Sequence, residues 1–316
     1  MKILVGNTGF VGSNICRNEN FDGLFHSSNV EQAFETKPDL LVYAGLRAER
    51  FLANHDPQRD LATIHQAFDN IRKIAPKRTV LISTVDVFKR PLDVFEDTKI
   101  DTEGLGAYGF NRYQLEERVR EAFEDALIVR LPGLYGTGIK KNFLFDIIHR
   151  TPVMLDKYKY VNLSQKSALV ADAYHQENNG YYKLRELTHK DKTQLRKFFI
   201  DCSFNALSFT DSRSVFQFYP LRFLWQHIQT ALNHNLRYLN VAVEPIEARD
   251  IYEVIAGEVF RNELPGVPAN YRMKTRFDKI FNGSNGFILD RTFLLQDIIS
   301  FAKAEIAQLT KGDEQQ

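Results

Sequence analysis

The feature that most constrains the fold of this chain is a glycine-rich turn directly after its first apolar run. Lys2–Val5 is predicted to be a short buried strand, and Gly6, Gly9 and Gly12 follow it at three-residue spacing. Glycines so placed allow a tight turn, a close approach of the backbone to a pyrophosphate, and close packing of a following helix. A helix predicted from Phe10 would direct its free N–H groups and its positive dipole end toward the phosphates. A strand before the turn and a helix after it predict a dinucleotide-binding turn.

Strands and helices alternate along the first half of the chain. Strands are predicted at Gly23–His26, Leu40–Tyr43, Thr79–Ser83 and Ala126–Leu131. Helices are predicted at Phe10–Arg17, at Val30–Thr36, from Pro57 with Asp56 as the cap, and at Tyr108–Phe123. This alternation predicts an α/β fold with a Rossmann-like doubly wound parallel sheet, covered by helices on both faces.

The pattern weakens after about residue 150. Helices are expected over Tyr181–Phe199, Leu221–Leu232, Ala248–Val259 and Asp290–Leu309, a strand over Leu236–Val243, and a frayed tail from Lys311. We therefore predict a dinucleotide-binding domain over residues 1–150. Residues 151–316 are predicted to form mainly a smaller C-terminal substrate lobe, with some segments returning to the sheet.

Composition and charge exclude several classes of protein. The chain has 316 residues and a formal net charge of +1 at pH 7. A charge this small does not favour nucleic acid or an anionic membrane as a partner. Cys16 and Cys202 form no CxxC pair, and the eight histidines show no ligand spacing, so no metal site is predicted. The first apolar run ends at Gly6, too early for a signal peptide or a membrane span. The expected protein is soluble and cytoplasmic.

The end of the second predicted strand bears on the choice of cofactor. An acidic residue there binds the ribose 2′-hydroxyl of NAD, and its absence tolerates the 2′-phosphate of NADP. His26–Asn29 contains no carboxylate, and Ser27 and Ser28 offer hydroxyl donors. The sequence favours NADP, with NAD possible.

A threonine and a tyrosine follow the fourth strand. Thr84 comes at the strand end, and Tyr108 and Arg112, four residues apart, share one face of the next predicted helix. A cation near a tyrosine stabilises the phenolate and lowers a pKa that is normally about 10. Such a tyrosine can exchange a proton with a carbonyl or an alcohol while hydride moves to or from a nicotinamide, with Thr84 binding the same substrate oxygen.

With these pieces the chain resembles the extended short-chain dehydrogenase/reductase family of nucleotide-sugar epimerases, dehydratases and reductases. The resemblance rests on Gly6–Gly12, Tyr43–Gly45, Ser83–Phe88, Tyr108–Glu116 and Arg130–Gly136, and more weakly on Val215–Tyr219, Leu239–Ala242 and Glu244–Pro245. It is strongest to about residue 145. About ten residues separate the second strand from Pro38, so the first half is most similar to the dTDP-4-dehydrorhamnose reductase-like members.

The resemblance and the chemistry of the turn together assign roles to particular residues. Catalytic roles fall on Thr84, Tyr108 and Arg112. The predicted cofactor contacts are Gly6, Gly9, Phe10, Val11, Gly12, Ser27, Ser28, Ala44, Gly45, Tyr108 and Arg112. The predicted substrate contacts are Asp86, Lys141, Asn142 and Arg213. For Lys141 and Asn142 the alternative is a solvated basic turn.

One residue departs from the family's pattern. The family has a lysine four residues after the tyrosine, which binds the nicotinamide ribose, and this chain has Arg112. Arginine keeps the charge, but it is longer, planar and never deprotonated, so ribose binding could be lost while electrostatic assistance survives. Dehydratases of the family place an acidic pair after the threonine, and Val85 occupies the first of those positions, which argues against dehydration.

The leading hypothesis is an NADP-preferring oxidoreductase that reduces a nucleotide-linked keto-sugar. The same residues could run an oxidation and return hydride to the other face, which would make the chain an NAD-dependent nucleotide-sugar epimerase. A non-catalytic NAD(P)-binding protein is the third hypothesis, because Arg112 replaces the lysine. The resemblance also implies a possible homodimer.

Overall fold

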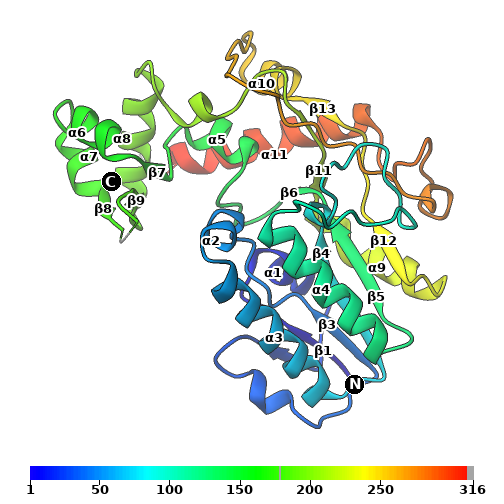
Figure 1. Cartoon of the computed structure of the whole chain (residues 1–316). Helices are drawn as coiled ribbons and strands as arrows, with labels where there is room; N and C mark the ends of the chain where they lie inside the picture. The colour runs from blue at the N-terminus through cyan, green and yellow to red at the C-terminus, as the bar shows by residue number, and fades with distance from the viewer. Residues whose placement is uncertain (178, 312–316) are drawn as a thin grey trace. The chain divides into compact units, whose positions relative to one another are not determined.

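The computed structural model of the chain describes residues 1–177 and 179–311 (Figure 1). The described chain divides into two compact units, each built from several segments. The first unit comprises Met1–Gly138, Val215–Pro245 and Asn270–Leu294. The second comprises Ile139–Ser214, Ile246–Ala269 and the chain from Leu295 onward.

The first unit is built on a six-stranded sheet in the order β12-β5-β4-β3-β1-β2. Its strands are β1 (Lys2–Val5), β2 (Gly23–Phe25), β3 (Leu40–Tyr43), β4 (Arg78–Thr84), β5 (Leu127–Leu131) and β12 (Tyr238–Asn240). Every neighbouring pair is parallel. The order reverses between β1 and β3, because β2 lies on one side of β1 and β3 on the other. In doubly wound sheets a reversal of this kind opens a ligand crevice at the carboxyl ends of the strands. The predicted fold class is confirmed.

The helices of the first unit are α1 (Phe10–Cys16), η1 (Val30–Ala33), α2 (Arg50–His55), α3 (Pro57–Ile74), η2 (Val85–Val87), α4 (Ala107–Ala122), η4 (Leu221–Phe223), α9 (Leu224–Asn233) and η5 (Asp278–Phe281). The long helices α3 and α4 pack on the sheet through apolar faces. Ile64 and Ile71 of α3 and Leu115 of α4 join one buried cluster with alternate residues of the strands, such as Ile3. Leu4, on the opposite face of β1, is also fully buried, so both faces of this strand are covered.

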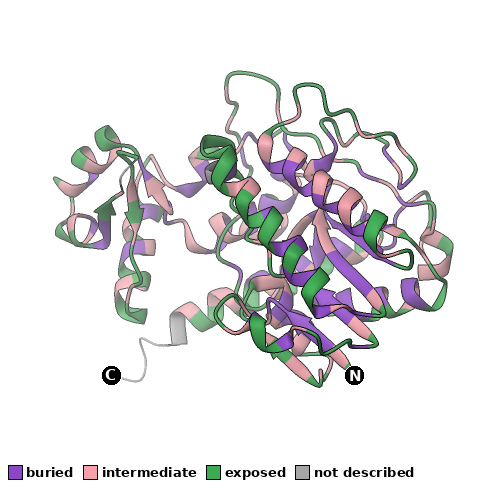
Figure 2. Cartoon of the chain, turned by 60° about the horizontal axis from the view of Figure 1, so that its bottom comes forward, coloured by how far each residue is buried: buried purple, intermediate pink, exposed green. Residues whose placement is uncertain are grey.

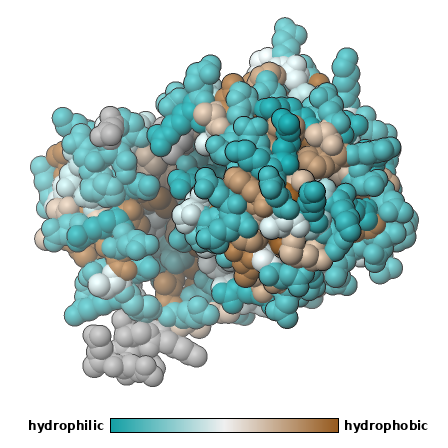
Figure 3. All heavy atoms as spheres, turned by 90° about the horizontal axis from the view of Figure 1, so that it is seen from below, coloured by the Kyte–Doolittle hydropathy of each residue, from teal (hydrophilic) through white to brown (hydrophobic). Residues whose placement is uncertain are grey.

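The exposed faces of the same helices are polar. Figure 2 shows the central strands buried and the outward sides of the covering helices exposed. On the face seen in Figure 3, hydrophilic side chains predominate and apolar ones lie in separate patches. Asp56 caps α3 by accepting a hydrogen bond from the backbone N–H of Arg59 at 3.1 Å, as predicted. Short strands β6 (Gly133–Tyr135) and β11 (Phe218–Pro220) pair in parallel, and β10 spans Val215–Phe216.

The second unit has its own small sheet and core. Its elements are α5 (Phe143–His149), β7 (Met154–Leu155), α6 (Lys157–Ser164), α7 (Ala168–Ala173), β8 (Tyr174–Gln176), β9 (Tyr182–Leu184), α8 (His189–Ile200), η3 (Ala206–Phe209), β13 (Ile246–Glu247) and α10 (Ala248–Ala256). Helix α11 (Arg291–Lys311) begins in the first unit and continues in the second. Strands β7, β9 and β8 are antiparallel and pack with helices α6–α8 around Val170, Leu195 and Phe199.

Several predicted elements need correction. The single helix predicted over Tyr181–Phe199 is wrong, because Tyr182–Leu184 pairs with two strands and α8 begins only at His189. Thr188 caps α8 by accepting from the N–H of Asp191, a local signal that the charge pattern hid. The predicted strand over Leu236–Val243 is shortened to Tyr238–Asn240.

The ends of the predicted domains also differ from the compact units. The first segment of the first unit ends at Gly138, whereas the predicted domain ends at residue 150. The reason is that α5 groups with the second unit, although its sequence continues the first without a visible break. Of the predicted tail, Lys311 ends α11, and residues 312–316 lie outside the described part of the chain.

Candidate functional site

The glycine-rich turn is held so closely that side chains would not fit at two of its glycines. Gly6 has φ +98°, and a Cβ there would lie 2.4 Å from the carbonyl oxygen of Ala44. A Cβ on Gly12 would lie 2.2 Å from the carbonyl oxygen of Gly6. The N–H of Gly9 donates to that same oxygen at 3.0 Å, and the N–H of Gly6 donates to the oxygen of Phe25 at 2.7 Å. The three glycines therefore fix a turn at the carboxyl end of β1, between the ends of β2 and β3.

The amino terminus of α1 opens from this turn. Gly9 is its N-cap residue, no side chain caps the helix, and its first turn has no acidic residue. The predicted contacts Phe10 and Val11 are the first two residues of this helix. Backbone N–H groups without a side-chain cap suit an anionic ligand. A pyrophosphate therefore fits the turn on two counts, its glycine surface and its uncapped helix end.

The ends of β2 and β3 border the turn. Ser27 and Ser28 are exposed, and the Ser28 hydroxyl lies 3.0 Å from Nδ1 of His26. Oδ1 of Asn29 accepts a hydrogen bond from the His26 N–H. Residues 26–29 of this loop carry no carboxylate. On the other side, the N–H of Ala44 donates to Val5 at 2.8 Å and so extends the pairing of β3 with β1. The structure thus brings the predicted cofactor contacts of the three strand ends together at one edge of the sheet.

Thr84 and Tyr108 are brought together by a close approach of α4 to the end of β4. Thr84 caps η2, where its hydroxyl accepts from the N–H of Asp86 at 3.2 Å. A Cβ on Gly109 would lie 1.9 Å from the carbonyl oxygen of Asp86, so only glycine lets α4 lie this near η2. Asn54 accepts from the N–H of Tyr108 at 3.0 Å and fixes the first turn of α4. Tyr108 is buried, and its side chain is within hydrogen-bonding reach of Thr84.

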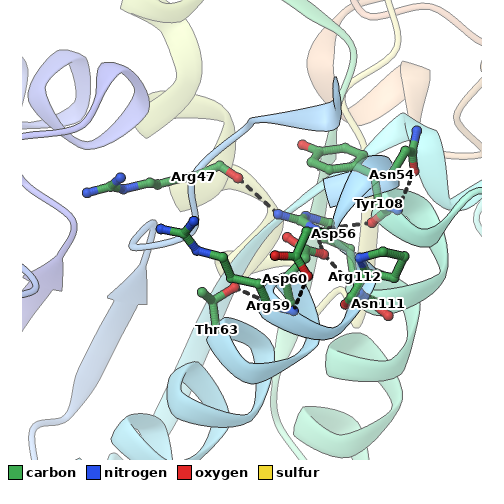
Figure 4. A network of polar contacts seen from close by, with 10 residues as sticks. Arg47, Asn54, Asp56, Arg59, Asp60, Thr63, Tyr108, Asn111 and Arg112 are labelled. Carbon is green, nitrogen blue, oxygen red and sulfur yellow. Dashed lines mark hydrogen bonds and ion pairs between the residues drawn. The ribbon is translucent and has the colours of Figure 1, made fainter. Parts of the chain in front are cut away.

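The guanidinium of Arg112 lies over the Tyr108 ring. Its Cζ is 3.9 Å from the ring centroid, and its Nη1 pairs with Oδ2 of Asp60 at 2.5 Å (Figure 4). Nη1 also donates to the carbonyl oxygen of Tyr108 at 3.3 Å, and Nη2 donates to that of Arg47 at 2.9 Å. Asn111 donates to the same Asp60 oxygen at 2.9 Å. Arg112 is therefore a buried and paired cation, with only 5% of its side chain exposed.

The expectation that Arg112 brings the pKa of Tyr108 below its ordinary value is wrong for this structure. Burial of the phenol raises the pKa of Tyr108 above 10 and is the largest influence. Arg112 and the hydrogen bond with Thr84 lower the pKa, but Asp86 and Asp60 raise it. The cation acts in the predicted direction, and it is outweighed by desolvation and by two carboxylates that the tyrosine–arginine spacing did not reveal.

A second set of polar groups lies beside Tyr108. Asp86 pairs with Nη1 of Arg50 at 3.2 Å, and the same nitrogen donates to the hydroxyl of Tyr271 at 3.0 Å. Burial raises the pKa of Asp86, and Arg50 partly opposes that rise. Asp86, a predicted substrate contact, is thus already paired with a side chain of this unit. Arg50 also lowers the pKa of Tyr271, which burial and Asp86 raise.

Sequence reasoning missed several members of this site. They are Arg47, Arg50, Asn54, Asp60, Gly109, Asn111 and Tyr271. Asp60 carries only the signal of an acidic residue in the first turn of a helix, which dipole stabilisation explains equally well. Tyr271 lies far along the chain, and no local pattern connects it with Asp86.

The other predicted substrate contacts belong to the second unit. Oδ1 of Asn142 caps α5 by accepting from the N–H groups of Leu144 and Phe145, at 3.0 and 3.2 Å. Lys141 is exposed. Arg213 pairs bidentately with Asp211, through Nε at 3.0 Å and Nη2 at 2.7 Å. Asn142 and Arg213 thus have structural partners, and their contacts with a substrate remain predictions.

Two features are absent from the described residues, 1–177 and 179–311: a membrane-spanning helix and a metal-binding cluster. None of their helices is both long enough and apolar enough to cross a membrane. No group of three or more His, Cys, Asp or Glu side chains among them could hold a metal ion. Cys16 and Cys202 are free and only partly buried.

The sheet order and the glycine turn define a Rossmann-like domain, and with the Thr84–Tyr108–Arg112 set it resembles the short-chain dehydrogenase/reductases. Residues 1–153 match the family model described as the RmlD substrate binding domain. The predicted resemblance to the extended family, and to its dTDP-4-dehydrorhamnose reductase-like members, is confirmed. No curated protein sequence matches the chain significantly.

Solved structures share the fold at low sequence identity. The dTDP-4-dehydrorhamnose reductase from Yersinia enterocolitica is 15% identical, with a TM-score of 0.62 over 96% of this chain and 99% of that one. The Bacillus anthracis enzyme of the same name, in complex with NADP, is 13% identical, with a TM-score of 0.62 over 96% and 97%. The UDP-N-acetylglucosamine 4-epimerase from Methanobrevibacter ruminantium, in complex with UDP-N-acetylmuramic acid, is 11% identical, with a TM-score of 0.63 over 97% and 98%. The fold of this chain is therefore one used by sugar-nucleotide reductases and epimerases.

Proposed function

We propose that this protein is an NADP-preferring oxidoreductase that reduces a nucleotide-linked keto-sugar. The observation that carries the proposal is the position of Tyr108, which lies beside Thr84 and stacks on Arg112. These groups follow the carboxyl end of β4, in the sheet whose β1 and β3 ends hold the glycine turn. A proton donor and a dinucleotide cradle are thus built on one sheet.

The cofactor is assigned from the turn and from the loop after β2. Gly6, Gly9 and Gly12 would hold the pyrophosphate, and Ala44 and Gly45 would line the neighbouring strand end. Ser28 offers a hydroxyl where an NAD-binding chain of this type carries a carboxylate. The reduced form, NADPH, would supply the hydride when bound. The complex of the Bacillus anthracis reductase with NADP supports this choice.

The acid in the reduction would be Tyr108. Burial keeps its hydroxyl protonated at neutral pH, as a donor to a carbonyl oxygen requires. Arg112 offsets the charge of the phenolate left behind, and Thr84 would donate a hydrogen bond to the same carbonyl oxygen. Oxidation of an alcohol, the first half of an epimerisation, needs Tyr108 deprotonated, which its raised pKa disfavours. Reduction is therefore preferred over NAD-dependent epimerisation.

The substrate is assigned by class only. Asp86 is the proposed sugar contact in the first unit. Lys141, Asn142 and Arg213, which belong to the second unit, stay predictions as substrate contacts. The complex of the Methanobrevibacter ruminantium epimerase with a UDP-sugar supports a nucleotide sugar as the ligand class. A homodimer and a cytoplasmic location remain predictions.

One observation favours a second candidate, a non-catalytic NAD(P)-binding protein. Arg112 is engaged by Asp60 and by the oxygen of Arg47, so the contact of the family's lysine with the ribose has no direct replacement in Arg112. In this alternative the turn binds the cofactor and Tyr108 transfers no proton.

The experiment separates cofactor binding from chemistry. The purified protein is denatured and any released nucleotide is identified by mass spectrometry; NADPH and NADH affinities are then measured by fluorescence titration. Oxidation of NADPH is followed with dTDP- and UDP-linked 4-keto-sugars. We expect Tyr108→Phe to bind NADPH normally and to lose at least about 100-fold in kcat, and Gly12→Val to lose binding. NADPH binding without turnover in the unsubstituted protein, together with an unchanged cellular phenotype in Tyr108→Phe and its loss in Gly12→Val, would favour the binding protein. Tightly retained NAD would favour the epimerase.

A further inference from the structure

Asp60 and Arg112 form an ion pair that is almost closed to solvent. The side chains are 10% and 5% exposed, and the pair joins the first turn of α3 to the first turns of α4. The carboxylate oxygen that accepts from Arg112 also accepts from Nδ2 of Asn111. In Figure 4 Asp60 and Arg112 point toward one another from the two helices. A carboxylate so placed restricts the orientation of the guanidinium.

The remaining bonds of Arg112 fix the plane of its guanidinium. The carbonyl oxygens of Arg47 and Tyr108 accept from two different terminal nitrogens, and Asp60 accepts from one of these. Three acceptors on three segments therefore hold the guanidinium over the Tyr108 ring, with Cζ 3.9 Å from its centroid. A lysine ammonium has no plane to orient, so this arrangement depends on arginine.

We propose that Asp60 is a positioning residue, which holds Arg112 over the ring of Tyr108 so that the guanidinium assists the phenolate and does not contact the cofactor ribose. This inference rests on the proposed function for its catalytic meaning. Its structural content concerns only Asp60, Arg112 and Tyr108. It links Arg112, which stands where the family has a lysine, to a carboxylate on the neighbouring helix α3.

The charged groups around Tyr108 determine in which direction its pKa should change when Asp60 is removed. Arg112 lowers the pKa of Tyr108, and Asp86 of η2 and Asp60 of α3 raise it, with Asp60 the smallest of these three influences. Arg50 of α2 pairs with Asp86 and also interacts electrostatically with Tyr108, and the Tyr271 hydroxyl lies 3.5 Å from Asp86. If Asp60 contributed only its charge, its removal would lower the pKa of Tyr108. If Asp60 positions Arg112, its removal releases the larger and opposite influence, and the pKa rises.

The test is a titration of Tyr108 in the protein without cofactor. The full chain is labelled with 3-fluorotyrosine, whose lower intrinsic pKa keeps the titration within the range where the protein is folded. The Tyr108 resonance is assigned in the 19F NMR spectrum by its loss in Tyr108→Phe. In Asp60→Asn we expect the pKa of Tyr108 to rise by about one pH unit, which is the size of effect that an adjacent guanidinium exerts. The matched control is Asp56→Asn, an exposed cap on the same helix, which should leave the titration unchanged.

Further variants cover the other outcomes. In an Arg112→Met background Asp60→Asn should lower the pKa, because only the direct charge is then removed. If Asp60→Asn does not fold, Asp60→Glu takes its place. It keeps the charge and displaces the guanidinium by one methylene, and the pKa of Tyr108 should rise in this variant as well. An unchanged or lowered pKa in Asp60→Asn, or in Asp60→Glu if that variant alone folds, would overturn the proposal. NADPH affinity of Asp60→Asn should stay within about twofold, and a loss of about tenfold or more would instead place Arg112 at the ribose.

The titration needs no turnover, so its outcome is independent of the proposed reaction. If Tyr108→Phe retained full activity, the proposed function would fail while the positioning of Arg112 by Asp60 could still be observed. Conversely, an unchanged pKa in Asp60→Asn together with an inactive Tyr108→Phe would remove only the positioning role.

Discussion

Replacement of Gly109 by alanine tests the contact that sets Tyr108 beside Thr84. A methyl group on Gly109 would lie 1.9 Å from the carbonyl oxygen of Asp86, whereas ordinary contact begins at 3.4 Å. Roughly 1.5 Å of separation must therefore be created between α4 and η2, by displacing backbone. Overpacking of this kind costs up to about 3 kcal/mol. Alanine in a helix interior gains about 1 kcal/mol over glycine.

The expected net loss of stability in Gly109→Ala is about 2 kcal/mol, or a fall in Tm of about 4–8 °C. Thermal unfolding followed by circular dichroism measures it. Gly106→Ala is the control, because a Cβ there lies 3.2 Å from Oδ1 of Asn54, a side chain that can shift by a few tenths of an ångström, whereas Gly109 faces backbone; its loss should stay under about 1 kcal/mol. The reasoning is refuted if Gly109→Ala raises Tm by a few degrees, since helix propensity would then be the only effect.

Three other perturbations follow from named groups. Glu116→Gln leaves the buried guanidinium of Arg130 without its charge partner, and urea unfolding should show a loss of about 3–5 kcal/mol; a loss below about 1 kcal/mol would contradict this. Burial raises the pKa of Asp146 from 3.8 to about 7, so the folded state binds the proton more tightly and stability falls as pH rises from 4 to 7. Asp146→Asn should therefore raise Tm more at pH 8 than at pH 4, by the equivalent of about 4 kcal/mol, and a pH-independent difference would refute the assignment. Ser28→Asp places a carboxylate after β2 and should shift the NADPH-to-NADH affinity ratio at least about tenfold toward NADH; an unchanged ratio would place the 2′-phosphate elsewhere.

The doubly wound fold could be predicted because its signals are local. Strand β1, the glycine turn and helix α1 follow one another within sixteen residues, and each apolar run of the sheet has the length of one buried strand. Where local signals conflict, the sequence misleads. Tyr182–Leu184 lies in a charge-rich stretch with helical spacing, and only its pairing with β7 and β8 makes it a strand.

The sequence by itself determined the parallel sheet, the glycine turn and the set Thr84, Tyr108 and Arg112, because strand length, glycine spacing and helical periodicity act between near neighbours. Only the tertiary structure decided which charged groups surround these three residues. Asp60 reaches Arg112 across two helices, and Asp86 is paired through Arg50, an arrangement that no spacing along the chain encodes. Burial then reverses the expected pKa shift of Tyr108, because the desolvation of a phenol depends on everything packed around it.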